Sequence, residues 1–259
     1  MPELPDLQVF SRNLEKKLKG KKVKKIVAPI SKKLNVSVPV LQKKLEKQTI
    51  KKIYREGKEL HIEFSKGDIL ALHLMLNGNL YLFDGENEHK NTIIELTFDD
   101  GKGLALTDWQ QMATPSLNPP AKTAPDALSK EMTSIYLKDQ LQKTRTTIKN
   151  FLLDQHVIRG IGNAYADEIL WDAGISPFSV CNKLPADAVK RLAKSIKKVL
   201  LQAEKNIIKK NPEIISGEVR DFLLIHNARK KSSPSGAAIE YKKTGGRKTY
   251  YTEEQELFK

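Results

Sequence analysis

Residues 154–170 read DQHVIRGIGNAYADEIL. Apolar residues at helical spacing lie on both sides of Gly160 and Gly162, which predicts a helix that ends near Val157, a Gly-x-Gly turn, and a second helix that begins at about Asn163. The glycines let the turn backbone lie close to a phosphate group, and the second helix adds amide donors and a positive dipole end. The Asn163 side chain is a further donor. An ordinary helical hairpin with an Asn cap has the same pattern, so this stretch alone leaves both readings open.

The rest of the sequence has a strand-rich first half and a helical second half. A helix is predicted over residues 7–19. Short apolar or alternating runs, separated by turn residues, predict strands of a β-sandwich or barrel at 50–54, 60–64, 69–73, 80–83, 93–98 and 104–107. Helical spacing returns at 129–141, 145–153, 163–173, 185–210 and 216–226. The runs around Thr244-Gly245-Gly246 predict a β-hairpin.

A linker is predicted where residues 113–126 carry Pro115, Pro119, Pro120 and Pro125. We therefore expect an α+β chain in four parts. These are an N-terminal β-sandwich domain with flanking helices at 1–112, a linker at 113–128, a helical domain at 129–228, and a hairpin at 229–259.

The composition favours a polyanionic partner. Lys and Arg number 45 against 31 Asp and Glu, a net charge of +14, and nucleic acid is the commonest partner of such a surface. A membrane is less favoured because no apolar run is long enough to span one. Cys181 is the only cysteine, which excludes an internal disulfide and a cysteine-rich zinc site. The N-terminus lacks the pattern of a signal peptide, so we expect an intracellular protein of the cytoplasm or nucleoid.

The chain begins Met-Pro-Glu-Leu-Pro-Asp. Removal of Met1 would leave Pro2 with a free secondary amine, and an α-amino group has a pKa about two units below that of lysine. More of it is neutral and nucleophilic, so it can attack C1′ of a nucleotide sugar and form an iminium adduct. Glu3 could protonate the sugar or shuttle protons. The other reading of these residues is a stiff terminus without chemistry.

The two motifs together resemble those of the formamidopyrimidine-DNA glycosylase/endonuclease VIII family, in which residues 154–170 are similar to the helix–two-turn–helix element. Four further segments match in order along the chain: REGK at 55–58, HLMLNGNL at 73–80, APDAL at 124–128 and GRKTYY at 246–251. The resemblance covers the whole chain. It implies an N-terminal β-sandwich, a helix–two-turn–helix domain and a C-terminal finger.

The resemblance also implies the roles of individual residues. Pro2 is the expected nucleophile, and Glu3 assists departure of the base. Lys58 and Arg247 belong to the expected catalytic set and, with Asn163, hold the phosphates beside the lesion. Further expected residues are His73 and Leu76 at the DNA, and Asp6 and Glu168 as supports of the active site, Glu168 by holding water or bracing the N-terminus.

The chain departs from the family pattern in its finger. The usual finger holds zinc with two Cys-x-x-Cys pairs, whereas the matching positions here are Ser232, Ser235, Thr252 and Gln255. These residue types are poor zinc ligands. We therefore expect a zincless finger that keeps Arg247, with packing and strand pairing in place of the metal. The alternative is a degenerate tail without function.

Two other departures concern the lesion and its partner base. Leu76 replaces the first residue that fills the space of the flipped nucleotide, and Gln110 replaces an arginine that contacts an opposite cytosine. Residues 223–231 are too few for the loop that covers a flipped 8-oxoguanine in some members. The pattern favours oxidised pyrimidines, formamidopyrimidines or hydantoins over 8-oxoguanine.

These observations predict a base-excision-repair glycosylase and AP lyase that acts on damaged double-stranded DNA, or on single-stranded or bubble DNA. We expect a monomer with no cofactor, no metal and no membrane partner. One alternative is a non-catalytic protein that binds damaged DNA or DNA junctions. Another is an RNA-binding protein, which would have no use for the Pro2-Glu3 terminus.

Overall fold

The computed structural model describes residues 1–244 and 246–259. The chain divides into two compact units. The first unit comprises Met1–Ala121 and Ile207–Glu218, and the second comprises Lys122–Asn206 and Val219–Lys259.

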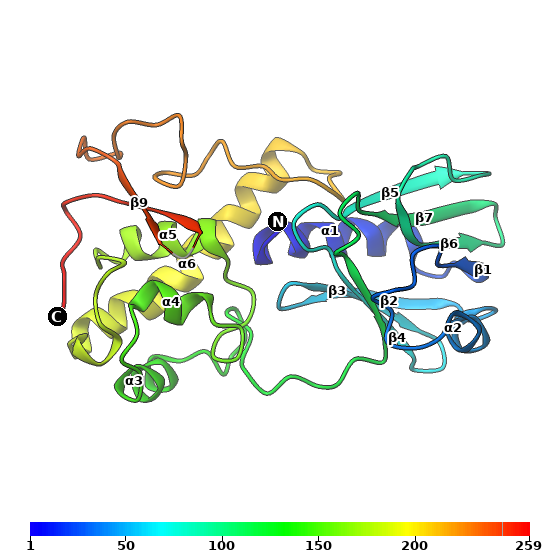
Figure 1. The fold of residues 1–259 in the computed structure, drawn as a ribbon, viewed down its shortest axis with the longest axis horizontal. Coiled ribbons are helices and arrows are strands. Elements are labelled where there is room, and N and C mark those ends of the chain that lie inside the picture. The colour runs from blue at the N-terminus through cyan, green and yellow to red at the C-terminus, as the bar shows by residue number, and fades with distance from the viewer. Residues whose placement is uncertain (245) are drawn as a thin grey trace. The chain divides into compact units, whose positions relative to one another are not determined.

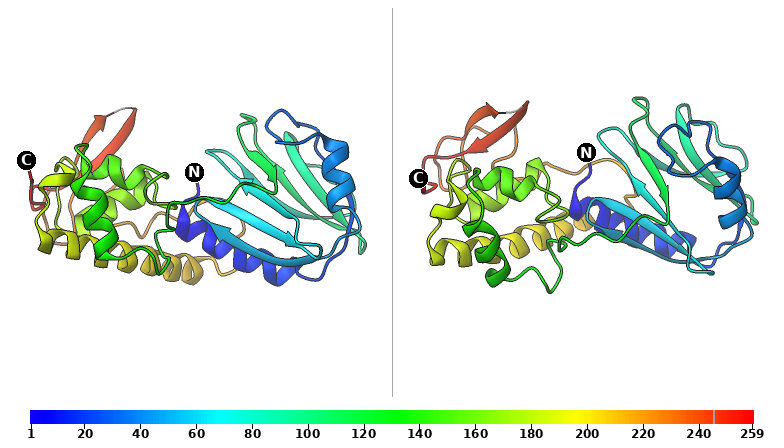
Figure 2. Two further views of the ribbon diagram at one scale, coloured as in Figure 1. Left: turned by 90° about the horizontal axis from the view of Figure 1, so that it is seen from below. Right: turned by 60° about the horizontal axis from the view of Figure 1, so that its bottom comes forward.

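The first unit is built around two four-stranded antiparallel sheets, which Figures 1 and 2 show as the layers of a sandwich. One sheet has the order β1-β6-β7-β5, with β1 (Val23–Val27), β6 (Thr92–Phe98), β7 (Lys102–Thr107) and β5 (Asn79–Asp84). The other has the order β2-β3-β4-β8, with β2 (Ile50–Glu56), β3 (Glu59–Phe64), β4 (Ile69–His73) and β8 (Thr114–Leu117).

Two helices accompany these sheets. Helix α1 (Leu4–Leu18) packs against β2 and β3, and α2 (Val38–Leu45) packs against β1. Leu4, Leu7, Leu14 and Leu18 of α1 are at most 2% exposed, and their three- to four-residue spacing places them on one face of the helix. This apolar face fixes α1 on the sheet and so fixes the chain's first residues.

The second unit is helical and ends in a hairpin (Figure 1). Its helices are α3 (Ser134–Gln142), α4 (Ile148–Leu153), α5 (Asn163–Asp172), the 3-10 turn η1 (Cys181–Lys183) and α6 (Ala186–Lys210), whose last four residues belong to the first unit. The hairpin consists of β9 (Glu240–Thr244) and β10 (Arg247–Tyr251), which pair with Arg247 opposite Thr244. Contacts join α5 to α4 and to β10.

The structure confirms the α+β class, the β-sandwich, the helical domain and the terminal hairpin. The predicted strands lie at their predicted positions, and α5 begins at Asn163. Gly246 has a φ of +79°, as a tight turn requires; Gly245 lies outside the described residues.

Two expectations are wrong. Residues 216–226 form no helix, because the backbone N–H groups of Leu224, Ile225 and His226 bond to the Glu168 carboxylate and not to helical carbonyls. The linker does not begin at residue 113, because residues 114–117 form β8. Pro115 has no backbone N–H group to donate. It fits in β8 because this strand lies at the edge of its sheet with β4 on its inner side, so its outer side needs no donor.

Strand β1 and helix α2, like β8 and η1, were not predicted. Strand β1 buries only Val23 and Ile26 fully, and α2 buries only Leu41 and Leu45, so neither has enough apolar residues to show a period. None of the helices in the described part of the chain combines the length and apolar character of a membrane span.

Candidate active site and nucleic-acid interface

The first unit holds the N-terminal motif at the start of α1. Glu3 is the N-cap residue of this helix and is 4% exposed. Its backbone N–H donates to Asp6 Oδ2 at 2.8 Å, and its side chain accepts from the Asp6 N–H. This reciprocal capping box holds the Glu3 carboxylate beside Pro2, at the positive end of the helix dipole. Met1 precedes Pro2 here, and its terminal amine forms an ion pair with Glu218.

Lys58 and His73 lie at the same end of one sheet. Lys58 follows Gly57 in the two-residue turn between β2 and β3, and Gly57 has a φ of +58°, which this type of turn requires. His73 ends β4, where it pairs with Glu59, the residue after Lys58. The register of β3 and β4 therefore brings together two residues that the sequence separates.

The loops at 74–78 and 108–113 are joined by a hydrogen bond in which Asn77 Nδ2 donates to Gln110 Oε1 at 2.6 Å. Gly78 closes the first loop, because a Cβ there would lie 2.2 Å from Leu74 O. In the second loop the Asp108 carboxylate accepts from the backbone N–H groups of Gln110, Met112 and Ala113 at 2.8–2.9 Å.

These tied loops present large apolar side chains to solvent. Leu76 is 65% exposed, Trp109 66% and Met112 40%. Met75 and Gln111 have φ values of +54° and +56°, a conformation that non-glycine residues rarely adopt and that often marks functional sites. Exposed aromatic and aliphatic groups on a strained, braced loop are suited to stacking on or wedging between bases.

In the second unit, the predicted turn is held by Gln155. Its amide donates to Ile161 O at 2.9 Å, and its oxygen accepts from the Gly160 N–H at 2.9 Å. The Gly160 amide is therefore used within the turn. Gly160 has a φ of +104°, which requires glycine, whereas Gly162 is an extended N-cap residue. Asn163 begins α5, and its Nδ2 donates to Lys248 O in the hairpin at 3.0 Å.

Asp167 is the hub of this unit. It is fully buried and forms an ion pair with Lys149 Nζ at 2.7 Å. Its Oδ2 also lies 2.7 Å from His226 Nδ1 and accepts from the Tyr250 N–H at 2.9 Å. Lys149, from α4, donates in addition to Thr249 Oγ1 at 2.9 Å. One buried carboxylate thus joins α4, α5, the segment before the finger, and β10.

Glu168, the next residue of α5, is 4% exposed and accepts backbone N–H groups from Leu224, Ile225 and His226 at 2.7–2.8 Å. Burial raises its pKa, and the three N–H donors oppose that shift. These three bonds fix the backbone of residues 224–226 against α5. Its expected role at the N-terminus stays a prediction.

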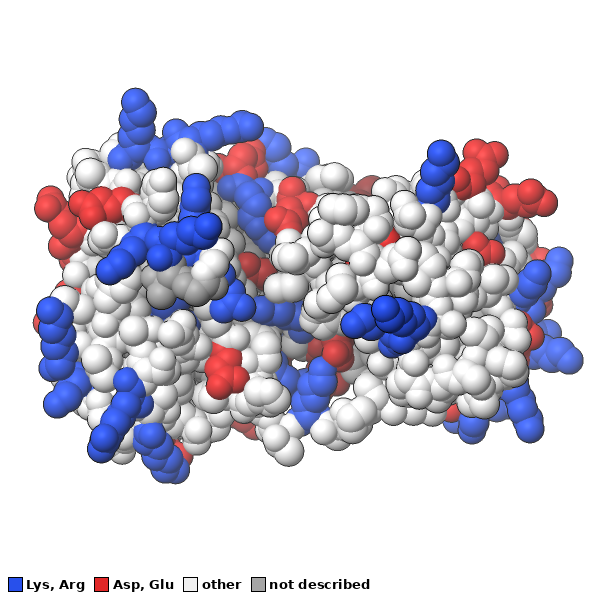
Figure 3. All heavy atoms as spheres, in the orientation of Figure 1, with Lys and Arg blue, Asp and Glu red and all other residues white. Residues whose placement is uncertain are grey.

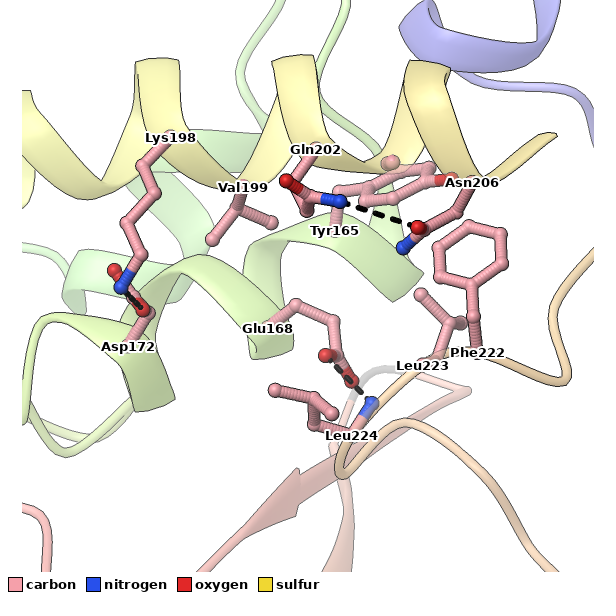
Figure 4. A pocket seen from close by; sticks show the side chains of 11 residues that line it. Tyr165, Glu168, Asp172, Lys198, Val199, Gln202, Asn206, Phe222, Leu223 and Leu224 are labelled. Carbon is pink, nitrogen blue, oxygen red and sulfur yellow. Dashed lines mark hydrogen bonds and ion pairs between the residues drawn. The ribbon is translucent and has the colours of Figure 1, made fainter. Parts of the chain in front are cut away.

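A cavity of about 200 Å³ lies beside Glu168, between α5, α6 and residues 222–224 (Figure 4). The polar groups on its wall pair with one another. Lys198 bonds to Asp172 at 2.6 Å, and Gln202 Nε2 donates to Asn206 Oδ1 at 3.2 Å. Its remaining wall is largely apolar and comes from Tyr165, Val199, Ala203, Phe222, Leu223 and Leu224.

The four positions that match zinc ligands in the finger are engaged in protein contacts. Ser232 forms a β-bridge with Ala238. The Ser235 and Thr252 hydroxyls donate to Glu254 at 2.8 and 3.2 Å. Gln255 Oε1 accepts from the Thr252 N–H, and its Nε2 donates to Ile175 O, both at 2.8 Å. Hydroxyl and amide groups do not fit a structural zinc, and the described residues contain no cluster of His, Cys, Asp and Glu suited to a metal.

The hairpin carries basic side chains on both of its strands. Lys242, Lys243, Arg247 and Lys248 are exposed, and Figure 3 shows Lys and Arg side chains gathered around its tip. Cys181, by contrast, is 1% exposed, and burial raises the pKa of its thiol to about 12. The thiol therefore stays protonated and is no candidate nucleophile.

The structure thus groups the predicted residues within each unit. In the first unit Glu3 lies with Asp6, and Lys58 with His73; in the second, Asn163 bonds to the hairpin that carries Arg247. Sequence reasoning missed Lys149, Asp167, His226 and Glu254. Asp167 stands in the recognised 154–170 stretch, but nothing in a single sequence shows which carboxylates are buried or which cation they meet.

Comparison with known protein families gives the class of protein. Residues 1–114 match the formamidopyrimidine-DNA glycosylase N-terminal domain, and residues 123–211 match the formamidopyrimidine-DNA glycosylase H2TH domain. Together with the sandwich and the α4–turn–α5 element, these matches define a DNA glycosylase of base excision repair.

Individual proteins agree. The formamidopyrimidine-DNA glycosylase of Carboxydothermus hydrogenoformans is 36% identical over 203 residues, 77% of this chain and 76% of that protein. That of Streptococcus mutans is 30% identical over 269 residues, 97% of each. Lactococcus lactis Fpg in complex with DNA containing an abasic site aligns with a TM-score of 0.87 at 26% identity, over 97% of this chain and 98% of that one. This chain belongs to the formamidopyrimidine-DNA glycosylase family.

The Asp167 hub leads to a stability prediction. Lys149→Met removes the cation but keeps most of the length of the side chain, and loss of one partner of a buried ion pair typically costs about 3–5 kcal/mol. The matched control is Lys143→Met, which breaks an exposed pair with Asp139 and should cost about 0.5 kcal/mol or less. Urea unfolding of both variants measures the difference. Equal losses of stability in the two variants would contradict the claim that the buried pair of Lys149 and Asp167 stabilises this unit.

Proposed function

We propose that this glycosylase removes a damaged base with Pro2 as its nucleophile and then nicks the strand. The observation that carries the proposal is the pairing of Pro2 with a buried Glu3 whose position is fixed by the capping box. A damaged nucleotide has to leave the duplex before its C1′ can be reached. The substrate is then damaged DNA, which the complexes of Lactococcus lactis Fpg with abasic-site and oxidized-pyrimidine DNA support.

The chemistry begins once Met1 is removed. The Pro2 nitrogen attacks C1′, the base leaves with the electrons of the glycosidic bond, and the proton that the Pro2 nitrogen then gives up passes to the departing base. Glu3 supplies a proton to the opening sugar. The nitrogen lone pair then forms the iminium. Loss of a C2′ proton expels the 3′ phosphate, a second elimination expels the 5′ phosphate, and water releases the sugar fragment from Pro2.

Phosphate binding is assigned to Lys58, Asn163 and Arg247. Lys58 lies on a turn fixed by Gly57, Asn163 at the N-terminus of α5, and Arg247 at the tip of β10. The helix N-terminus adds a positive dipole end. The +14 net charge supplies the general attraction to DNA.

Selection of the lesion and of its partner base is assigned to the two tied loops. Gln110 is neutral and already bonded to Asn77, so it cannot act as a guanidinium on an opposite cytosine. Leu76, Trp109 and Met112 offer apolar surface instead, which is tolerant of base identity. We propose that oxidised pyrimidines, formamidopyrimidines or hydantoins are preferred to 8-oxoguanine, with little dependence on the opposite base.

The nucleophile is tested by one preparation before and after processing. A cleavable N-terminal extension keeps the Pro2 nitrogen as an amide, which cannot form an iminium, and proteolysis then exposes it. We expect borohydride trapping to abasic DNA only after cleavage, and a sharp loss of nicking in Pro2→Gly. Glu3→Gln should slow base removal more than nicking of a preformed abasic site.

Full trapping and nicking by the uncleaved protein would contradict the Pro2 mechanism. Tight binding of abasic DNA without any trapping, even after cleavage, would favour the alternative of a non-catalytic protein that binds damaged DNA.

The substrate class is tested with single-lesion duplexes in which each lesion faces each of the four bases. We expect faster excision of oxidised pyrimidines than of 8-oxoguanine opposite cytosine. Rates should differ less than about tenfold between opposite bases, because apolar contact is tolerant of base identity and a tenfold difference needs about 1.4 kcal/mol. An enzyme that prefers 8-oxoguanine opposite cytosine would contradict the assignment of the two loops.

A further inference from the structure

The base of the finger is closed by one carboxylate. Glu254 Oε2 accepts from Ser235 Oγ at 2.8 Å, from Thr252 Oγ1 at 3.2 Å and from Ser233 Oγ at 3.3 Å. Ser233 and Ser235 also bond to one another at 2.7 Å. The side chain of Trp171, on α5, lies near enough to Glu254 to contribute to the lowering of its pKa. Three segments of chain, at 233–235, at 252–254 and on α5, therefore meet at one carboxylate.

We propose that Glu254 is a positioning residue that does in this finger what a metal ion does in a metal-bound one, and that it acts on DNA binding through Arg247. The part of the proposal that concerns Arg247 rests on the proposed function. The geometric basis is that two of the four positions matched to zinc ligands, Ser235 and Thr252, turn their hydroxyls to the same carboxylate. A metal gathers anionic ligands around a cation, whereas here hydroxyl donors gather around an anion.

The ionised state of Glu254 follows from these contacts. The hydrogen bond from Ser235 lowers the pKa of Glu254 most, and Thr252, Ser233 and Trp171 lower it further. A carboxylate accepts several donors at once, which a neutral amide or a methyl group cannot do equally well.

The other contacts of the hairpin indicate how Glu254 could act on Arg247. Lys149, Asp167 and Asn163 hold β10 through Thr249, the Tyr250 N–H and Lys248 O. Arg247 lies beyond these contacts, at the tip, where its strand partner is Thr244 of β9. Residues 233–239 lead directly into β9, and Glu254 fixes the start of that segment. Release of this end frees β9, and with it the strand that sets the position of Arg247.

The matched control is the neighbouring residue. Glu253 carries the same charge and, like Glu254, is exposed. The two residues differ in the contacts with Ser233, Ser235 and Thr252 that Glu254 makes through its carboxylate, so Glu253→Ala reports the loss of one negative charge from the same loop. Glu254→Ala removes the acceptor. Glu254→Gln keeps one acceptor oxygen and most of the side chain, so it separates loss of the carboxylate from poor folding of the Ala variant.

The test is a double-mutant cycle between Glu254 and Arg247. Binding is measured on a duplex that contains an uncleavable tetrahydrofuran abasic site, so the result does not depend on catalysis. We expect Arg247→Ala to weaken binding on the order of tenfold, as loss of a charge-assisted phosphate contact does, and Glu254→Ala to weaken it measurably but by no more than that factor, because it acts through Arg247. Glu254→Gln should weaken it less, and Glu253→Ala should leave it unchanged. In the Arg247→Ala background, Glu254→Ala should weaken binding by less than about a further twofold.

A second readout is independent of DNA. The chain has two tryptophans, so in a Trp109→Phe background the fluorescence is that of Trp171. Glu254→Ala should shift this emission and Glu253→Ala should not. Independent, additive effects of Glu254 and Arg247 on binding would overturn the route through Arg247. An unshifted Trp171 emission, or about one zinc ion per chain in the wild-type protein with activity lost to a chelator, would overturn the closure by Glu254. Failure of the proposed function would appear separately, as absence of trapping with both of these readouts intact.

Discussion

The buried pair of Lys149 and Asp167 is the interaction on which the second unit depends. Both side chains are at most 6% exposed, and charges at this depth are tolerated only when each keeps its partner and its hydrogen bonds. Asp167 meets those conditions with His226 and the Tyr250 N–H, and Lys149 does so with Thr249. These contacts hold the middle of β10, at Thr249 and Tyr250, against α4 and α5.

The parts of the fold that the sequence predicts are those with local causes. The glycine at 160, the apolar spacing of α5 and the alternating strands of the sandwich all act over a few residues. The helix expected at 216–226 fails because a distant carboxylate, Glu168, takes the N–H groups that a helix would use. The pairing of Lys149 with Asp167 and the closure by Glu254 escape prediction for the same reason. Each depends on which residues meet in space, and a single sequence does not contain that information.

The N-terminus and the finger have different expected functions, which are catalysis and phosphate binding. The N-terminal residues need chemical reactivity, and the structure gives Glu3 a fixed, buried position at a helix start. On the proposed function, the finger needs only to hold the Arg247 cation in place. The proposed closure by Glu254 would then let hydroxyls and a carboxylate replace thiolates and a metal without a change in the tip that carries Arg247.

The central claim is that the first residue of the processed chain carries out the chemistry. The most direct measurement is peptide mapping by mass spectrometry of the borohydride-reduced complex with abasic DNA. The account predicts that the sugar remnant is attached to the N-terminal peptide, on the Pro2 nitrogen, and that Lys58 is unmodified. A remnant attached to Lys58 or to any other lysine would contradict it.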